Sequence, residues 1–145
     1  MSGSFSNFQA TAILQHMLGS AAYTIPGHHY LALATVLPDD TTTGVTLKET
    51  DYTAYARTEI GTGNNTSDAW NTVTGTLAGT VTNKNAITCP TARGASTSPI
   101  VGVAVVDNSS AGAGNIVVWA SVTSTAIALG DTPKVNAAGL TVTLD

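Results

Sequence analysis

The sequence predicts a mainly β fold, an antiparallel β-sandwich of jelly-roll type with one N-terminal α-helix. The 145-residue chain contains 25 threonines, and Thr is a β-branched residue that suits a half-buried pleated surface. One segment near the N-terminus has apolar residues at helical spacing. The rest divides into seven or eight short apolar runs separated by turn-forming residues. The length is typical of one domain, so residues 1–145 are expected to form a single β-sandwich domain.

The predicted helix covers about residues 6–18, within the segment SNFQATAILQHMLG. Ser6 and Gln9 have the spacing of a capping box, in which each side chain satisfies a backbone N–H at the helix start. Gly19 follows as the C-terminal stop. The apolar residues form one stripe that must pack on a surface, either the chain's own sheet, which we favour, or a neighbouring chain. The stripe consists of Ala10, Ile13, Leu14, Met17 and Leu18.

The strands are expected where apolar runs lie between clusters of Gly, Pro, Asn and Asp. A strand is predicted at 29–36 and a second at 52–60, the latter with Tyr55 and Arg57 on one face. Residues 73–90 predict one or two Thr-rich strands. Residues 99–106 and 115–123 predict a hairpin whose tip, 107–114, is mobile, and two more short strands follow, broken near 130 and 138.

The largest apolar side chains of these strands are the predicted core. Val103 and Val105 share one face of their strand, whereas Val118 and Trp119 point to opposite faces. Trp119 is therefore a candidate for the outer face, where it would contact an oligomer partner or another protein. The predicted core residues are Tyr30, Leu31, Leu33, Tyr55, Trp70, Ile87, Val103, Val105, Val118 and Trp119.

The charge pattern excludes several classes of partner. Charged residues make up 10% of the chain, against about 25% for an average soluble protein, and the net charge is −4. The five Lys and Arg residues are scattered singly, so no basic stripe exists to bind nucleic acid. No apolar run approaches a membrane span and no signal peptide is recognisable, so a soluble protein made in a cytoplasm is expected. Cys89 has no disulfide partner and is interpreted as a core residue.

No catalytic or metal-binding pattern is complete. His28 and His29 are adjacent, so on a strand they point to opposite faces and would need metal ligands from elsewhere. The Gly-rich segments GTGNNT and GAGNIV do not complete a phosphate-binding motif, and G-x-S-x-G is absent. A dispersed Ser/His/Asp triad, or a calcium site using Asp39, Asp40 or Asp107, stays open without a supporting spacing. The chain is expected to be no enzyme and to need no cofactor or metal.

Several segments, taken in order, resemble a family of small tailed-phage virion proteins. These segments are YLALATVLPDD, YARTEI, GTVTNKNAITCPTA, IVGVAVVDNSSAGAGNIVVWASV and ALGDTPKVNAAGLTVTLD. Members of the family are labelled either as head decoration (cement) proteins or as tail-fibre or minor tail proteins. The resemblance implies a structural virion component and implies no catalytic residues.

The favoured hypothesis is a capsid decoration protein that binds and stabilises the assembled icosahedral head. Tail fibres commonly carry coiled-coil heptads or fibrous repeats, and this chain has neither. The alternative is a minor tail or tail-fibre component involved in host attachment. The decoration hypothesis places the protein, made in the host cytoplasm, on the outer surface of the phage head, with the major capsid protein and further copies of itself, as a dimer or trimer, as partners.

The contacts are expected to come from the loops and the helix, because the strands are committed to the core. The candidate contact loops are 38–51, 61–72, 91–98 and 107–114, all poor in charge. The candidate interface residues are Trp119, Asp39, Asp40, Asn64, Asn65, Arg93, Asn108 and Ser109.

Overall fold

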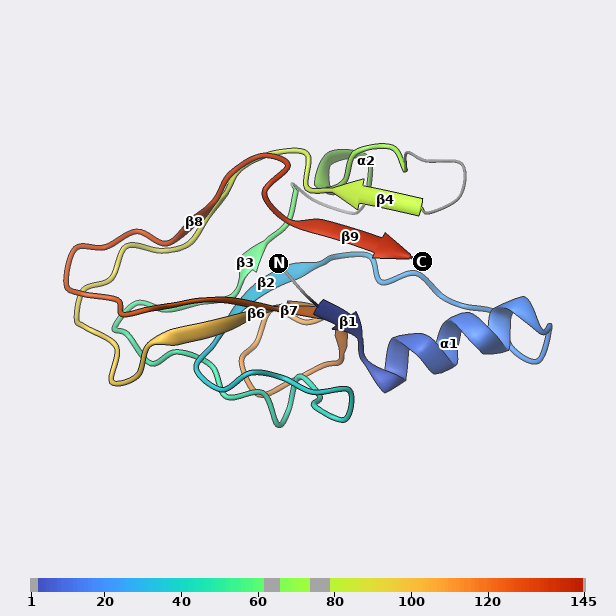
Figure 1. Ribbon diagram of the computed structural model, residues 1–145, viewed down its shortest axis with the longest axis horizontal. Helices are drawn as coiled ribbons and strands as arrows, with labels where there is room; N and C mark the ends of the chain where they lie inside the picture. Colours follow the sequence, from blue (N-terminus) through green and yellow to red (C-terminus); the bar gives the residue numbers. More distant parts are fainter. Residues whose placement is uncertain (1–2, 62–65, 74–78, 145) are drawn as a thin grey trace.

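The computed structural model describes residues 3–61, 66–73 and 79–144 (Figure 1). Within these ranges the chain forms nine strands and two helices. The mainly β, antiparallel class with an N-terminal helix is therefore confirmed. The second helix, α2 at Thr66–Ala69, is a single turn that the sequence did not predict. Neither helix of the described part has the length and apolar character that a membrane crossing requires.

The main sheet has five strands in the order β1-β7-β6-β2-β3, and every neighbouring pair is antiparallel. Its bounds are β1 Gly3–Phe5, β2 Tyr30–Ala34, β3 Thr58–Glu59, β6 Ile100–Val106 and β7 Ile116–Thr125. The β6–β7 hairpin lies where the sequence placed it. The sequence did not reveal β1, because three residues are too few to show an alternating pattern.

Two short ladders form a second layer along one side of the main sheet (Figure 1). In one ladder β4 (Gly79–Thr82) pairs with β9 (Thr141–Leu144), and in the other β5 (Ile87–Thr88) pairs with β8 (Lys134–Val135). All four strands fall in segments that the sequence predicted as short strands. The second layer is thus built from two-stranded pieces, joined by turns, rather than from one continuous sheet.

The hydrophobic core fills the space between the main sheet and this second layer. Leu31 and Val103 from the main sheet pack there with Ile87 and Leu140 from the second layer. Cys89 is buried in the same cluster, and burial raises the pKa of its thiol, as expected for a core residue rather than a reactive one. Of the predicted core residues, this cluster contains or contacts Leu31, Leu33, Tyr55, Trp70, Ile87, Val103, Val105 and Val118.

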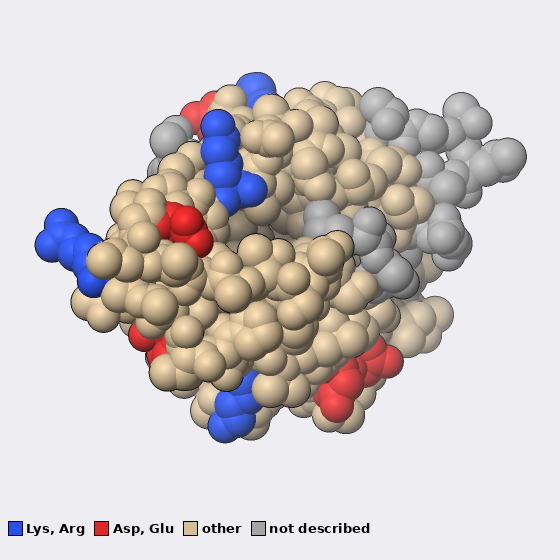
Figure 2. Space-filling model, turned by 60° about the vertical axis from the view of Figure 1, so that its left-hand side comes forward, with Lys and Arg blue, Asp and Glu red and all other residues tan. Residues whose placement is uncertain are grey.

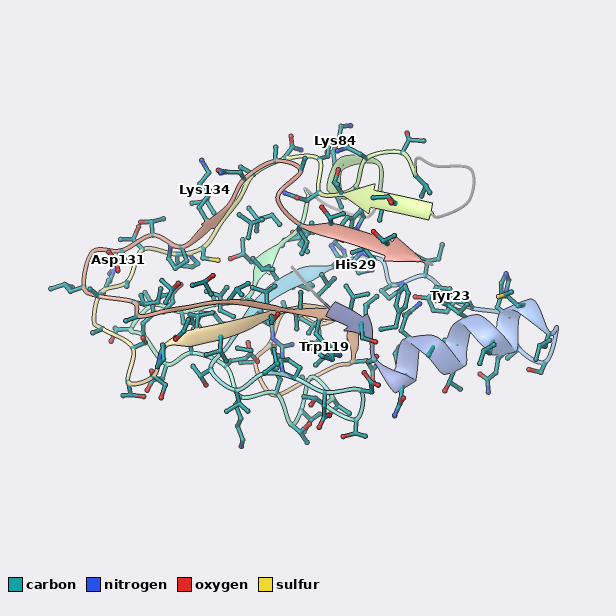
Figure 3. The ribbon with its side chains drawn as sticks, viewed as in Figure 1. Tyr23, His29, Lys84, Trp119, Asp131 and Lys134 are labelled. Carbon is teal, nitrogen blue, oxygen red and sulfur yellow. The ribbon has the colours of Figure 1, made fainter. Side chains whose placement is uncertain are left out.

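A smaller apolar cluster lies on the opposite face of the main sheet, and it holds the remaining two predicted core residues, Tyr30 and Trp119. Trp119 and Val118 therefore point to opposite faces, as strand alternation predicts. This second face is covered in part by Leu47, so the Trp119 ring is half-buried (Figure 3). Its indole Nε1 is shielded from solvent without an acceptor among the described residues.

The strand predicted at 52–60 is wrong over most of its length, because only Thr58–Glu59 pairs with β2. Residues 52–55 form a turn, in which the Tyr55 N–H donates to the Tyr52 carbonyl and Ala54 has a φ of 80°. Tyr52 is buried in the core, where its hydroxyl donates to the Pro90 carbonyl at 3.0 Å. Tyr52 and Tyr55, three residues apart, therefore make separate contacts instead of lying along one strand.

Helix α1 (Asn7–Met17) begins at Ser6, whose hydroxyl oxygen accepts a hydrogen bond from the Gln9 N–H at 3.2 Å. The reciprocal half of the predicted capping box is absent. The Ser6 N–H instead donates to the Val117 carbonyl of β7 at 3.3 Å, and the Gln9 side chain accepts from the Tyr23 hydroxyl. The helix start is therefore fastened to the main sheet.

Candidate binding site

Helix α1 and the segment that follows it form an arm, residues 7–28, that extends beyond the end of the main sheet (Figure 1). Tyr23 holds the arm together (Figure 3). Its hydroxyl donates to Gln9 Oε1 at 3.0 Å, and its backbone N–H donates to His16 Nδ1 at 3.3 Å. The returning segment is thereby bonded to both ends of the helix.

The apolar stripe of α1 is largely exposed, which corrects the prediction that it packs on the chain's own sheet. Leu14 is 57% exposed, Met17 74% and Leu18 81%. The physical reason is the position of the helix. Only its first turn lies against the sheet, where Gln9 is buried, and the remaining turns extend away from it. Soluble monomers rarely leave a contiguous apolar surface uncovered, so the arm has the character of a contact surface.

A cavity of about 450 Å³ lies at the base of the arm. The arm contributes Phe8 and the segment 23–28, β2 contributes Tyr30, and residues 107–109 after β6 close the other side. This volume falls within the range of small-molecule sites, which are typically concave and combine aromatic surface with a few polar groups.

The aromatic wall of the cavity is fixed by two contacts of His28. Its ring stacks on Tyr30, with a centroid distance of 6.2 Å and an interplanar angle of 23°. Its Nδ1 lies 2.7 Å from Glu59 Oε1 on β3. The two rings are therefore held in place by the sheet beneath them.

The polar wall is the loop after β6, and its base is firmly bonded. Asp107 Oδ1 accepts from the Asn115 N–H at 2.6 Å, and Oδ2 accepts from Asn115 Nδ2 at 2.9 Å. Gly114 has a φ of +78°, and a Cβ there would come within 2.3 Å of Asp107 Oδ1, so only glycine fits. The sequence predicts a mobile tip at 107–114, and the structure instead ties both ends of this loop down.

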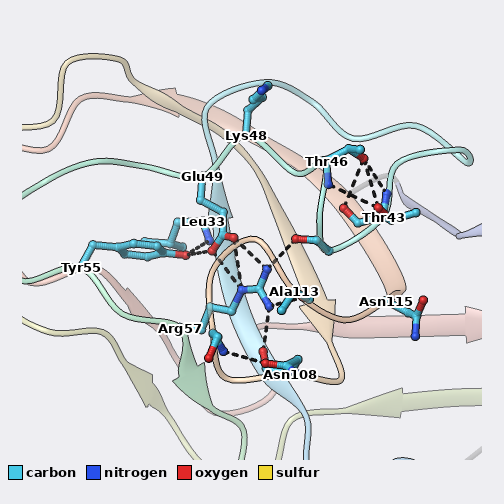
Figure 4. Close-up of polar contacts among 12 residues, drawn as sticks. Leu33, Thr43, Thr46, Lys48, Glu49, Tyr55, Arg57, Asn108, Ala113 and Asn115 are labelled. Atoms are coloured by element: carbon cyan, nitrogen blue, oxygen red, sulfur yellow. Dashed lines mark hydrogen bonds and ion pairs between the residues drawn. The ribbon is translucent and has the colours of Figure 1, made fainter.

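Three side chains, Arg57, Glu49 and Tyr55, form a group that we call the Arg57 clamp, and it is hydrogen-bonded to the 107–114 loop (Figure 4). Arg57 NH1 donates to the carbonyls of Asn108 and Ala113, each at 2.8 Å. The remaining donors bond Glu49, and NH2 also bonds the Gly44 carbonyl. All five guanidinium N–H groups thus have acceptors.

The clamp is almost fully buried. The side chains of Arg57 and Glu49 are 0% and 6% exposed, and the Tyr55 hydroxyl donates to Glu49 Oε2 at 2.6 Å. Burial, together with the neighbouring Glu49 carboxylate, raises the pKa of Tyr55 far above its usual range, so Tyr55 stays a neutral donor. The clamp joins three segments: residues 44–49, the turn before β3, and the 107–114 loop that lines the cavity.

A model of the family described as podophage GP4 fiber I protein gp80 matches residues 4–143. The chain belongs to the gp80 family. The predicted resemblance to a family of phage virion proteins is thereby confirmed, and the family's description names a fibre rather than a head decoration protein. A search of curated proteins finds no match. The gp80 match spans the helix, the main sheet and both ladders, so it covers every part of the site.

The structure places only two of the eight candidate interface residues at the cavity of this gp80-family chain, Asn108 and Ser109. Asp39 is exposed, and hydrogen bonds from Thr41 and Thr42 lower its pKa. Trp119 lies on the second face of the sheet, and Asn64 and Asn65 lie outside the described residues. Asp40 and Arg93 are exposed and line no part of the cavity.

The space-filling view agrees with the sparse charge of the gp80-family chain (Figure 2). On the face shown, Lys and Arg side chains stand apart from one another, separated by uncharged surface. The described residues contain no group of three His, Cys, Asp or Glu side chains that could hold a metal ion. His28 and His29 diverge as expected, because His28 bonds Glu59 while His29 meets the edge of Trp70.

The stability of the gp80-family chain should fall in mild acid because of His29. Burial lowers the pKa of His29 below its usual value of 6.5, while Asp107 acts in the opposite direction and His28 adds to the lowering. As the pH falls through 6.5, the unfolded chain binds a proton that the folded chain does not, so the stability present above 6.5 is lost below it. Urea unfolding at about pH 7.5 and about pH 5.5 should show a smaller acid loss for His29→Gln than for the wild type. Equal losses would show that another group is responsible.

Proposed function

We propose that this chain is a structural subunit of a fibre on a tailed-phage particle and that it takes part in host attachment. The family match over residues 4–143 is the observation that carries the proposal, because the family's description names a fibre. The absence of heptads and repeats, which favoured a head decoration protein, is a weaker argument. A fibre can also be assembled from compact domains joined through their contact surfaces.

The arm supports a role in assembly. Residues 7–28 contain no Asp, Glu, Lys or Arg, so the exposed stripe can be buried against a neighbour without removing an ion from water. We propose that this neighbour is another subunit of the same fibre, in a symmetric homo-oligomer. The chain is proposed to have no catalytic role and to need no cofactor, nucleic acid or membrane.

Localisation of the chain in purified particles tests the proposal. An antibody against the chain, used with electron microscopy and quantitative mass spectrometry of the particle, gives both position and copy number. We expect label at the tail and a copy number far below that of the capsid protein. Label spread over the shell, with a copy number close to that of the capsid protein, would instead establish a decoration protein.

The double variant Met17→Gln and Leu18→Gln should weaken self-association while leaving the fold intact. Both side chains are more than 70% exposed, so the stability change should stay within about 0.5 kcal/mol. The dimerisation or trimerisation constant, measured by analytical ultracentrifugation, should fall by about tenfold or more, equivalent to about 1.4 kcal/mol. Leu129→Gln, an equally exposed apolar position outside the arm, is the matched control. Association as strong as in the wild type would rule out the arm as the contact.

A further inference from the structure

We propose that the cavity at the base of the arm binds a neutral saccharide. The proposal deepens the proposed fibre function and rests on it for its biological meaning, because host attachment requires a surface ligand. Three properties of the cavity support it: the aromatic surface, the hydrogen-bonding groups that have no partner in the described part of the chain, and the charge.

The aromatic surface suits the apolar faces of a sugar ring. Phe8 is 44% exposed at the cavity, and the stacked rings of His28 and Tyr30 line another side. A pyranose is amphipathic, since its axial C–H groups form apolar patches while its hydroxyls project around the ring edge. Aromatic rings with a free face therefore offer such a ligand a rigid apolar contact.

The polar wall offers both donors and acceptors. Within the described part of the chain, neither the Ser109 hydroxyl nor the Asn108 side-chain NH₂ has a hydrogen-bond partner, and both residues line the cavity. Each Asp107 oxygen accepts one bond from Asn115 and retains the capacity for another. A sugar hydroxyl is donor and acceptor at once, so several adjacent hydroxyls can use this mixed set.

The charge at the cavity decides the class of saccharide. No Lys or Arg lines it, and Asp107 is the acidic residue that does. A phosphate or a carboxylated sugar would therefore meet Asp107 with no Lys or Arg to offset its charge. A small organic cation would find Asp107 and aromatic rings, but it would leave the hydroxyl of Ser109 and the amide of Asn108 unused. A neutral polyhydroxylated ligand uses all of these groups.

The site is formed before any ligand arrives. The Arg57 clamp holds the Asn108 carbonyl, and Tyr23 fastens the arm that carries Phe8. Binding therefore orders few additional groups, which lowers the entropic cost of capturing a small ligand.

Chemical-shift titration of the ¹⁵N-labelled 145-residue chain tests the proposal. The probes are the methyl glycosides of glucose, galactose, mannose, rhamnose and N-acetylglucosamine, with choline and inorganic phosphate as comparison ligands. We expect at least one glycoside to shift the amides of Phe8, Asn108 and Ser109 saturably at millimolar concentration, and choline and phosphate to leave them unchanged.

Two variants test the assigned contacts. Phe8→Ala should weaken binding of the best glycoside about tenfold, and Ser109→Ala should weaken it measurably. Thr11→Ala changes an exposed side chain of the same helix outside both the cavity and the apolar stripe, and it should leave the affinity unchanged. Both α1 variants should unfold at the wild-type temperature, so that an effect of Phe8→Ala reports binding rather than folding.

The proposal is overturned if no glycoside shifts the cavity amides, if choline does so instead, or if Phe8→Ala and Ser109→Ala bind like the wild type. These outcomes are independent of the particle experiment. A chain found at the tail that binds no glycoside would retain the fibre function and lose the saccharide site. A chain found on the head shell that binds a glycoside would lose the fibre function and retain the saccharide site.

Discussion

Replacing Arg57 by Met should lower the free energy of unfolding by about 3–5 kcal/mol, because it leaves a buried carboxylate without its partner. Glu49 would lose its ion pair, which spans 2.8 Å to Arg57 NH2, and keep only the Tyr55 hydroxyl. The carbonyls of Asn108, Ala113 and Gly44 would lose their donors at the same time. Met retains most of the apolar volume, so the loss reports the polar contacts. Urea unfolding followed by tryptophan fluorescence measures the change.

Arg93→Met is the matched control, because Arg93 is exposed and the same substitution there should change stability by less than about 0.5 kcal/mol. The double variant Glu49→Leu and Arg57→Met adds a second test. A simple buried ion pair can often be replaced by apolar residues without loss. Here the double variant should stay well below the wild type, because three backbone carbonyls lose their donor and the Tyr55 O–H loses its acceptor. If the double variant regained the wild-type free energy of unfolding, the stabilisation would come from the Glu49–Arg57 ion pair alone and not from the hydrogen bonds to the loop carbonyls.

The three longer strands of the main sheet, β2, β6 and β7, were predictable from the sequence because each signal is local. Residues 100–106 and 116–125 are apolar runs on either side of a segment of turn formers, and such a pattern specifies a hairpin. The core residues follow from the same alternation, since Val103 and Val105 must share a face. Short elements such as β1 carry too few residues for a periodic pattern.

The Arg57 clamp could not be predicted, because most of its acceptors are backbone carbonyls. The carbonyls of Asn108 and Ala113 lie more than fifty residues from Arg57 in the sequence. Because every residue type has a backbone carbonyl, the residue types at these positions do not indicate the contact. The Tyr-Ala-Arg segment, residues 55–57, has an alternating pattern that predicts a strand. In the structure its Tyr and Arg side chains converge on one carboxylate.

The cavity and the exposed arm could not be predicted from the sequence for a related reason. The amphipathic stripe of α1 indicates an apolar face, but the direction in which the helix leaves the sheet decides whether that face is covered. The start of the helix is fixed by Ser6, whose backbone N–H donates to the Val117 carbonyl of β7, and such a contact gives no periodic signal in the sequence. The cavity walls come from three separate parts of the chain, so Asn108 and Ser109 could be named as contact residues without their partners.

Asn83 holds the second layer together, as the Arg57 clamp holds the loops of the opposite face. It is fully buried, and its side-chain NH₂ donates to the carbonyls of Asn85 and Asn136, each at 2.8 Å. Its Oδ1 accepts from the Leu140 N–H at 2.8 Å, so the side-chain NH₂ and the side-chain oxygen are both hydrogen-bonded. The end of β4 is thereby joined to the turn that leads into β9.

Substituting Asn83→Asp should destabilise the chain by about 3–5 kcal/mol although it changes hardly any volume. The substitution puts an oxygen where the NH₂ group stood, so two donated hydrogen bonds become contacts between acceptors, inside a site that excludes water. Unfolding in urea measures the loss. Asn136→Asp is the matched control, because that side chain is exposed beside the same turn and contributes only its carbonyl to the contact. A loss at Asn83 no larger than at Asn136 would mean that water satisfies these carbonyls and that the β4–β9 ladder holds without the amide.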